Sequence, residues 1–314
     1  MGNSNLAKFL KDKKCFKLVC GAGNEDINEV EKLVHLYSMA GCNIFDVSAN
    51  VEVVLAAKKG LEEAGIQKDR FICVSVGIKG DPHIRKALID EKTCRRCFKC
   101  QINCPQSAIE KLVVNNKKCI GCLKCLPACK FNSIKVKEYP TDLTKILPEI
   151  VKQNVDCIEF HAIGDDEIEV DEKWQILNNC FDGMLSICVD RAKLSNEKLK
   201  SRLKRMLKLR DDYSTIIQAD GSPMSGGIDD YKTTLQAVAT AEILQKEKFP
   251  AFVLLSGGTN SKTADLAKLC GVDINGVAIG SFARSIVKDY LCGKMEFYEA
   301  LRIAKNLVDS VVEV

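Results

Sequence analysis

"CRRCFKCQINCP" (residues 94–105) holds four cysteines in twelve positions, and "CIGCLKCLPACK" (119–130) repeats the same spacing. The whole chain of 314 residues has 17 cysteines. Disulfide frameworks of this density belong to small secreted scaffolds. This chain is long, and its N-terminus lacks the apolar stretch and the cleavage site of a secretory signal. The two runs are therefore predicted to bind metal in a reducing compartment, and we expect a cytoplasmic protein.

The spacing of both runs, Cys-x2-Cys-x2-Cys-x3-Cys, is that of bacterial ferredoxins with two [4Fe–4S] clusters. Three thiolates on a tight loop bind one cube, and the fourth completes the partner cube. The predicted ligand sets are Cys94, Cys97, Cys100 and Cys129 for one cluster, and Cys104, Cys119, Cys122 and Cys125 for the other. Zinc is the alternative, but all-thiolate zinc sites usually use two separated cysteine pairs and would leave a third cysteine over.

One position departs from the ferredoxin pattern. Pro105 follows the fourth cysteine of the first run, whereas Lys130 stands at the matching place in the second. We expect this change to alter the surroundings of one cluster, and hence its potential, without removing a ligand.

The cysteine segment is strongly basic. Residues 92–137 contain eleven Lys and Arg and a single acid, Glu110, so this segment carries +10 in a chain of net charge +4. Two oxidised clusters would offset about −4 of this charge. The excess predicts an acidic electron partner. Nucleic acid is the weaker alternative, because Phe98 and Phe131 are the only aromatic residues there for base stacking.

The remaining nine cysteines lie outside the two runs, and several fall in strand-like stretches such as "FICVSV". We interpret all nine as small buried hydrophobic residues: Cys15, Cys20, Cys42, Cys73, Cys157, Cys180, Cys188, Cys270 and Cys292. No window of the sequence is apolar enough for a membrane-spanning helix.

Outside the cysteine segment, short apolar runs alternate with helical periods. Eight such runs predict strands, at 16–20, 43–49, 70–76, 156–162, 183–189, 214–220, 251–257 and 276–281. Eight βα units predict a (β/α)8 TIM-like barrel built from residues 1–79 and 141–314, with a ferredoxin-like domain, 80–140, inserted after the third strand. A doubly wound open sheet is the alternative.

Glycines follow the last two predicted strands, where many such barrels bind a phosphate group. The candidate cofactor-binding residues are Gly257, Gly258, Thr259, Gly280 and Ser281, and FMN or another phosphate-containing molecule is the candidate ligand. Simple tight turns are an equally good interpretation.

Other polar residues fall near the ends of predicted strands: Asp46, Ser48, Glu159, His161, Asp190, Gln218 and Asp220. Glu159 and His161 are two residues apart, so both project from the same strand face, as an acid–base pair or, more simply, as a structural hydrogen bond. Lys17 lies near the start of its strand, away from the expected catalytic face. The loop 218–230, "QADGSPMSGGIDD", is either an elaborate turn or part of a binding site.

Four segments together resemble the LdpA family, the light-dependent period proteins of cyanobacteria and related lineages: "GDPHIRKA" (80–87), "QADGSPMSGG" (218–227), "LSGGTN" (255–260) and "GSFAR" (280–284). The resemblance covers essentially the whole chain. It implies an iron–sulfur protein that passes the light-dependent redox state of the cell to the circadian clock, with the eight cysteines as cluster ligands. It implies no catalytic residues.

The sequence thus leaves three functions open. A redox-sensing regulator with an acidic redox or clock-related protein partner agrees best with the resemblance. A ferredoxin-coupled oxidoreductase with a flavin in the barrel mouth is the second, so enzymatic activity is undecided. A nucleic-acid-binding or structural role is the third. The sequence gives no prediction of oligomeric state.

Overall fold

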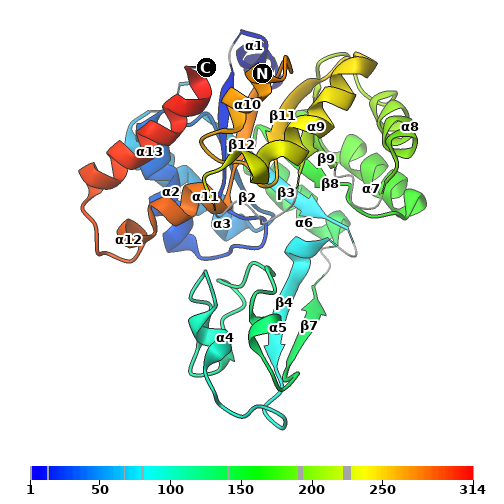
Figure 1. Cartoon of the computed structure of the whole chain (residues 1–314). Coiled ribbons are helices and arrows are strands. Elements are labelled where there is room, and N and C mark those ends of the chain that lie inside the picture. Colours follow the sequence, from blue (N-terminus) through cyan, green and yellow to red (C-terminus); the bar gives the residue numbers. More distant parts are fainter. Residues whose placement is uncertain are drawn as a thin grey trace.

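The computed structural model describes residues 2–12, 14–66, 68–78, 81–139, 142–189, 194–221 and 228–313. Its main body is a closed barrel of eight parallel strands surrounded by helices (Figure 1). The strands are β1 (Cys15–Val19), β2 (Ile44–Ser48), β3 (Phe71–Gly77), β8 (Cys157–His161), β9 (Met184–Val189), β10 (Thr215–Asp220), β11 (Phe252–Ser256) and β12 (Gly276–Ile279). They pair in chain order, and β12 closes onto β1. The predicted barrel is confirmed, and the open sheet is wrong.

Helices cover the outside of the barrel. Most of them are preceded by a capping residue whose side chain accepts a hydrogen bond from a backbone N–H of the first turn. They are α2 (Ile27–Ala40), α3 (Val51–Ala64), α6 (Leu143–Val151), α7 (Glu167–Cys180), α8 (Asn196–Leu207), α9 (Tyr231–Glu247), α10 (Thr263–Leu269), α11 (Ser281–Ile286), α12 (Lys288–Leu291) and α13 (Phe297–Val312). The capping residues are Asp26, Asn50, Asp142, Asp166, Ser195 and Asp230.

The barrel interior changes character along its axis. At the amino ends of the strands, α1 (Gly2–Asp12) closes the barrel with Leu6, Phe9 and Leu10, which pack on apolar strand residues such as Ile44 and Phe252. The middle and the carboxyl ends instead hold buried polar side chains, although such barrels are usually filled by branched apolar residues. The polar set comprises Lys17, Asp46, Ser75, Glu159, His161, Ser186, Gln218 and Asp220.

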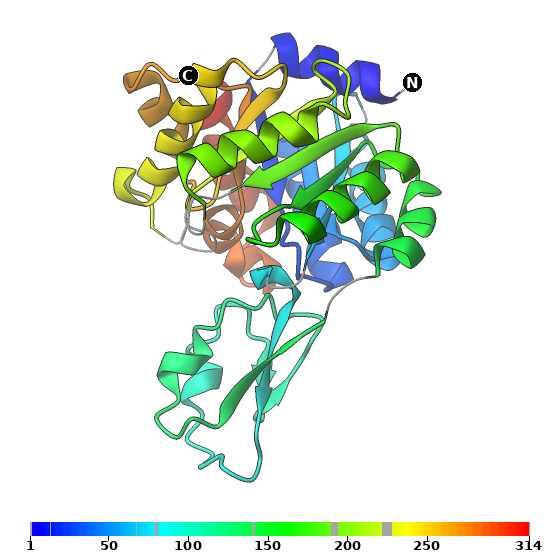
Figure 2. The same ribbon diagram turned by 90° about the vertical axis from the view of Figure 1, so that its right-hand side faces the viewer.

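The segment between β3 and α6 leaves the barrel as a separate lobe. It begins with a 3-10 turn (Pro82–Ile84) and contains β4 (Arg85–Ile89), α4 (Lys99–Ile102), β5 (Ile109–Glu110), β6 (Val113–Val114), α5 (Cys125–Ala128) and β7 (Ile134–Glu138). Strands β4 and β7 pair in antiparallel fashion. Both views show this lobe below the carboxyl ends of the barrel strands, opposite α1 (Figures 1 and 2). The predicted domain boundaries, at 79–80 and 140–141, lie outside the described residues.

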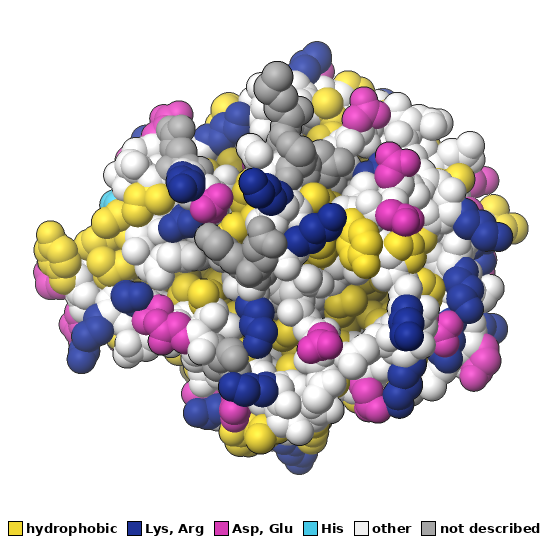
Figure 3. Space-filling model, turned by 90° about the horizontal axis from the view of Figure 1, so that it is seen from above, with side chains coloured by type: hydrophobic (Ala, Val, Ile, Leu, Met, Phe, Trp, Pro, Cys, Tyr) yellow, Lys and Arg dark blue, Asp and Glu magenta, His cyan; other side chains and the backbone are white. Residues whose placement is uncertain are grey.

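Two surface features complete the fold. Seen from the end remote from the lobe, basic and acidic side chains are intermixed (Figure 3). This pattern contrasts with the basic composition of residues 92–137. Among the described residues, no helix has the length and apolar character that crossing a membrane requires.

Candidate functional site

The lobe gathers the eight cysteines of the two runs into two groups of four. One cavity is lined by Cys94, Cys97, Cys100 and Cys129, and a second is lined by Cys104, Cys119, Cys122 and Cys125. We call these the distal set and the proximal set, because only the second adjoins the barrel. Each set draws three cysteines from one run and the fourth from the other. This is the same division that the spacing predicts, whereas the ligand role itself stays a prediction.

The backbone of the two runs repeats the same turns. Residues with positive φ occur at matching positions, which pair as Arg96 with Gly121, Phe98 with Leu123, and Ser107 with Asn132. Bulky residues seldom adopt this conformation, and strained residues of this kind cluster at functional sites. Backbone N–H groups also point at sulfur: Arg96 N lies 3.4 Å from Cys94 Sγ, and Ala108 N lies 3.3 Å from Cys104 Sγ. Four thiols around each cavity, with N–H groups directed at sulfur, fit an iron–sulfur cube.

The proximal set lies against the carboxyl end of the barrel. Ile120, between two of its cysteines, is buried and lines both the proximal cavity and the pocket in the barrel mouth. Lys86 of β4 is buried and donates to Gly23 O (2.7 Å) in the loop after β1 and to Cys119 O (2.6 Å). Any group held by the proximal set would therefore lie next to the barrel mouth, to which its loop is joined by these contacts.

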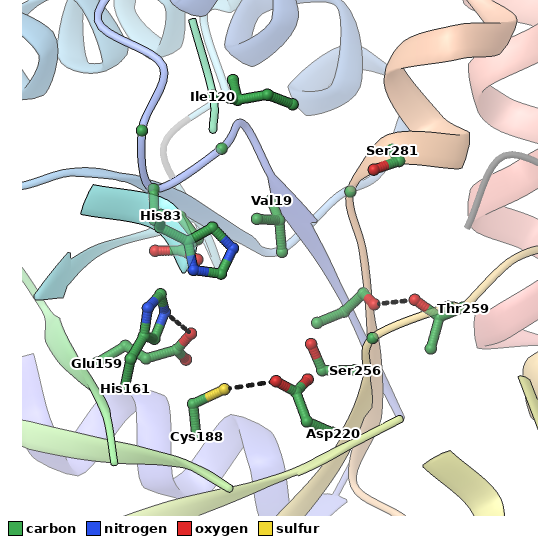
Figure 4. A pocket seen from close by; sticks show the side chains of 18 of the residues that line it. Val19, His83, Ile120, Glu159, His161, Cys188, Asp220, Ser256, Thr259 and Ser281 are labelled. Carbon is green, nitrogen blue, oxygen red and sulfur yellow. Dashed lines mark hydrogen bonds and ion pairs between the residues drawn. The ribbon is translucent and has the colours of Figure 1, made fainter. Parts of the chain in front are cut away.

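The mouth pocket is a cavity of about 80 Å³ at the carboxyl ends of the strands (Figure 4). It is lined by all five residues predicted to bind a cofactor: Gly257, Gly258, Thr259, Gly280 and Ser281. The hydroxyl of Thr259 donates to the Ala278 carbonyl, so that hydrogen bond is made within the fold. The structure brings these residues together, and their phosphate-binding role remains a prediction.

One wall of the pocket carries a chain of hydrogen-bonded acids and histidines. Asp81 accepts from His161 Nδ1 through Oδ2 and from His83 Nδ1 through Oδ1, each at 2.8 Å. His161 Nε2 lies 3.4 Å from Glu159 Oε1. Burial alone would lower the pKa of His161, but Asp81 and Glu159 outweigh burial and raise it well above its usual value. Contact with His161 correspondingly lowers the pKa of Asp81, and Lys17 together with His161 lowers the pKa of Glu159, although burial opposes both shifts.

Below this wall, Lys17 connects Glu159 to a second carboxylate. Lys17 Nζ lies 2.6 Å from Glu159 Oε2 and 3.6 Å from Asp46 Oδ2. Burial alone would lower the pKa of Lys17, but attraction to Asp46 and Glu159 raises it well above its usual value. Lys17 lies beneath the pocket, as predicted. It is nevertheless part of the site, because it pairs with a residue of the pocket wall.

Cys188 and Asp220 form the floor of the pocket. Cys188 Sγ donates to Asp220 Oδ2 at 2.8 Å, and both side chains are at least 95% buried. Burial, together with nearby carboxylates, raises the pKa of the Cys188 thiol well above its ordinary value. Burial also raises the pKa of Asp220. Cys188 is buried, as predicted, but it also lines the pocket and donates a hydrogen bond to a carboxylate.

Three of the nine cysteines outside the runs are exposed, namely Cys180, Cys270 and Cys292. For these three the core interpretation is wrong. They lie at or just beyond helix ends, where the apolar periodicity of the sequence no longer distinguishes the core face from solvent.

Arg284 forms the opposite wall of the pocket. Its side chain is 7% exposed, and Nη1 donates to Cys20 O at 3.1 Å. It lines the mouth pocket and also a second cavity of about 420 Å³, which contains Cys122 of the proximal set. A buried cation thus stands between the barrel mouth and the proximal cysteines.

The loop that follows His161 is held by Arg202 of α8. Arg202 is fully buried and donates to Ala162 O (2.6 Å) and Gly164 O (2.8 Å), and it pairs with Glu167. An anchor of this kind fixes the end of β8, and so the position of His161.

Asp81, His83, Cys188 and Arg284 were not predicted to be site residues. Asp81 and His83 lie in "GDPHIRKA" and Arg284 lies in "GSFAR", two of the segments that carry the family resemblance. The resemblance therefore marked these segments, but it did not indicate what any of the three side chains does. Asp190 and residues 222–227 of the glycine-rich loop lie outside the described residues.

Comparison with known proteins agrees with this geometry. A family model described as the light dependent period A C-terminal domain (LdpA_C) matches residues 149–310, and a 4Fe-4S binding domain matches residues 112–135. Light dependent period A of Synechococcus elongatus is 31% identical over 310 residues, which cover 95% of this chain and 88% of the relative. The chain belongs to the LdpA family. The LdpA match includes Glu159, His161, Cys188 and Asp220, and the 4Fe-4S match includes four cysteines of the second run.

Solved structures share the barrel fold of this LdpA family member at low sequence identity. Tryptophan synthase from Mycobacterium tuberculosis aligns with a TM-score of 0.52 at 10% identity, over 98% of both chains. GGGPS from Thermoplasma volcanium aligns with a TM-score of 0.50 at 11% identity, over 99% of this chain and 97% of that chain. These similarities show the fold alone.

Proposed function

We propose that this protein is a redox-sensing regulator that holds two [4Fe–4S] clusters and relays the redox state of the cell to a protein partner, as its membership of the light dependent period family suggests. Bound at the two cysteine sets, such clusters supply one-electron redox chemistry. The observation that carries the proposal is the order of the sites, in which the proximal set lies between the distal set and the barrel mouth, with Ile120 shared by the proximal cavity and the mouth pocket.

The distal set suits electron exchange with an acidic carrier. Cys97 is exposed at the surface, and Phe98 and Phe131 beside it are 44% and 48% exposed. The surrounding cations Arg96 and Lys99 are exposed as well. An apolar contact surrounded by basic side chains matches the electrostatic complementarity that steers electron-transfer partners.

The proximal set suits the sensing step, because barrel and lobe meet there through polar contacts. Glu25 N donates to Lys117 O at 2.7 Å, and Lys118 Nζ lies 3.3 Å from Asp26 Oδ2. These contacts join the proximal cysteine loop to the loop after β1. A change of charge at the proximal set would therefore act on contacts that position the lobe on the barrel.

Reduction of the protein by a small acidic ferredoxin tests this proposal. The Arg96→Glu/Lys99→Glu variant should be reduced at least tenfold more slowly at low salt, and the difference should shrink as ionic strength rises. Lys232→Glu/Lys268→Glu makes the same charge change on exposed helix residues of the barrel and should react like the wild type. Equal rates for both variants, with full iron content, would refute a distal docking face.

A second function is favoured by the mouth pocket, in which a ligand would lie beside the proximal set. Five glycine-loop residues and the buried Arg284 line this pocket. In an oxidoreductase, FMN or another phosphate-containing molecule would bind there. Acid extraction of the anaerobically purified protein decides between the two functions. Stoichiometric flavin would favour the oxidoreductase, whereas its absence would favour the sensor.

A further inference from the structure

We propose that Glu159, His161 and Cys188 bind a divalent first-row transition-metal ion, such as Zn²⁺ or Fe²⁺, at the floor of the mouth pocket. This site is separate from the eight cysteines of the lobe, and it does not depend on the proposed redox relay. A carboxylate oxygen, an imidazole nitrogen and a thiol sulfur, one from each residue, all lie within 4.8 Å of one another, and all three residues are buried. Figure 4 shows the three side chains facing a common space beside Asp220.

The fold holds His161 in the orientation that is usual for a metal-binding histidine, with one ring nitrogen bonded to a carboxylate. Its Nδ1 is bonded to Asp81 at 2.8 Å, which leaves Nε2 facing Glu159. Histidines that bind metals almost always use their second nitrogen in this way, to a carboxylate or a carbonyl. Asp81 already has a hydrogen bond to each of its two oxygens, from His161 and from His83. The alternative grouping of Asp81 with the two histidines is therefore satisfied without a metal.

The buried carboxylate of Asp220 is an independent observation that points to a ligand in the pocket. Its side chain is 4% exposed and lines the pocket, and Oδ1 has no hydrogen-bond partner of good geometry among the described residues. Burial raises the pKa of Asp220, and the nearby Ser256 hydroxyl is among the groups that oppose this shift. A buried carboxylate oxygen without a partner costs free energy. A water bound to the metal would satisfy it, because Asp220 lies beside the sulfur of Cys188. Three protein ligands with an open fourth position are typical of reactive metal sites.

The charged groups around the site can accommodate a divalent cation. Four buried carboxylates surround the floor and wall of the pocket, namely Asp46, Asp81, Glu159 and Asp220. Lys17 and His161 are the buried cations that the structure places among them. Arg284, on the opposite wall, is attracted to Glu29 instead. On binding, a divalent ion would replace the Nε2 proton of His161 and the thiol proton of Cys188, so its two charges would take the place of those two protons among the buried carboxylates.

The donor set selects the class of metal. A thiolate and an imidazole disfavour Mg²⁺ and Ca²⁺, which prefer oxygen, and suit Zn²⁺ or Fe²⁺. The ligands come from neighbouring strands, β8 and β9, whose hydrogen-bonded register places His161 opposite Cys188. The barrel therefore holds all three donors on a rigid frame, because Glu159 also lies in β8.

Zinc binding to the anaerobically purified, cluster-containing full chain tests the proposal. After incubation with Zn²⁺ and desalting, we expect about one zinc per chain with unchanged iron, and one sulfur neighbour in zinc X-ray absorption. His161→Gln and Cys188→Ala should weaken zinc binding at least tenfold in competition with a chelator. Asp81→Asn should weaken it about 10–100-fold through the orientation of His161. Cys42→Ala removes a buried thiol that does not line the pocket and should bind zinc like the wild type.

Iron content and thermal unfolding show whether each variant is folded, and Asp81→Asn provides a test that leaves every proposed ligand in place. Zinc with four sulfur neighbours would mean that it occupies a cluster site and would overturn the proposal. No stoichiometric zinc, or wild-type affinity in folded His161→Gln and Cys188→Ala, would overturn it as well.

Discussion

Lys17 and Glu159, 142 residues apart in sequence, form an ion pair inside the barrel, with Lys17 Nζ 2.6 Å from Glu159 Oε2. Removing the lysine would leave the carboxylates of Glu159 and Asp46 buried together. We expect Lys17→Met to destabilise the protein by about 3–5 kcal/mol. Thermal unfolding followed by circular dichroism measures this change. Lys59→Met removes an exposed pair with Glu31 and should leave the stability close to that of the wild type, and equal losses for the two variants would contradict a buried pair.

Gly77 leaves the space that Asp81 needs. A Cβ at Gly77 would lie 1.9 Å from Asp81 Oδ2, so Gly77→Ala should displace the carboxylate from His161 and His83. We expect a loss of about 1–3 kcal/mol. A double-mutant cycle in thermal unfolding separates the cause. In an Asp81→Ala background, Gly77→Ala should cost much less. Additive losses would show that the clash with Asp81 is not the reason.

Lys86 anchors the lobe to the barrel through two carbonyls. Lys86→Met should leave Gly23 O and Cys119 O without this donor, and so increase hydrogen exchange in residues 117–121. We expect the free energy of local opening in these residues to fall by about 1–3 kcal/mol. Lys135→Met, on the paired strand β7, removes only an exposed contact with Asp90. Its exchange should match the wild type, and the prediction fails if Lys86→Met behaves in the same way.

Burial should make the core thiols unreactive even at alkaline pH. It raises the pKa of Cys15 to about 12, so the reactive thiolate stays scarce at pH 9. Iodoacetamide should label Cys180, Cys270 and Cys292 in the native cluster-containing protein, because these three are exposed. Cys15 should remain unlabelled at pH 7 and at pH 9 until the protein is unfolded. Peptide mass spectrometry reads each position, and native labelling of Cys15 would contradict a closed barrel base.

The barrel could be predicted because its strands are buried on both faces and therefore read as short apolar runs between helical periods. The two cysteine sets could be predicted because the spacing in each run fixes which thiols share a loop. Helix α1 was missed, although Leu6, Phe9 and Leu10 follow helical spacing, because nothing in the sequence says that a short terminal helix closes the barrel.

The chemistry of the mouth was harder to predict. Asp81 meets His161 across 80 residues of chain, and its approach depends on the absence of a side chain at Gly77. Cys188 looks like any core cysteine until Asp220 of the next strand is placed beside it. Such contacts follow from barrel register and loop conformation, which residue patterns do not encode.

Iron and acid-labile sulfide, counted in anaerobically purified protein, test the two-cluster assignment most directly. We predict about eight of each per chain for the wild type and for Cys42→Ala, and about four for Cys125→Ala, because the distal set should still hold its cluster. About four in the wild type, or zinc in place of iron at the eight cysteines, would contradict two [4Fe–4S] clusters.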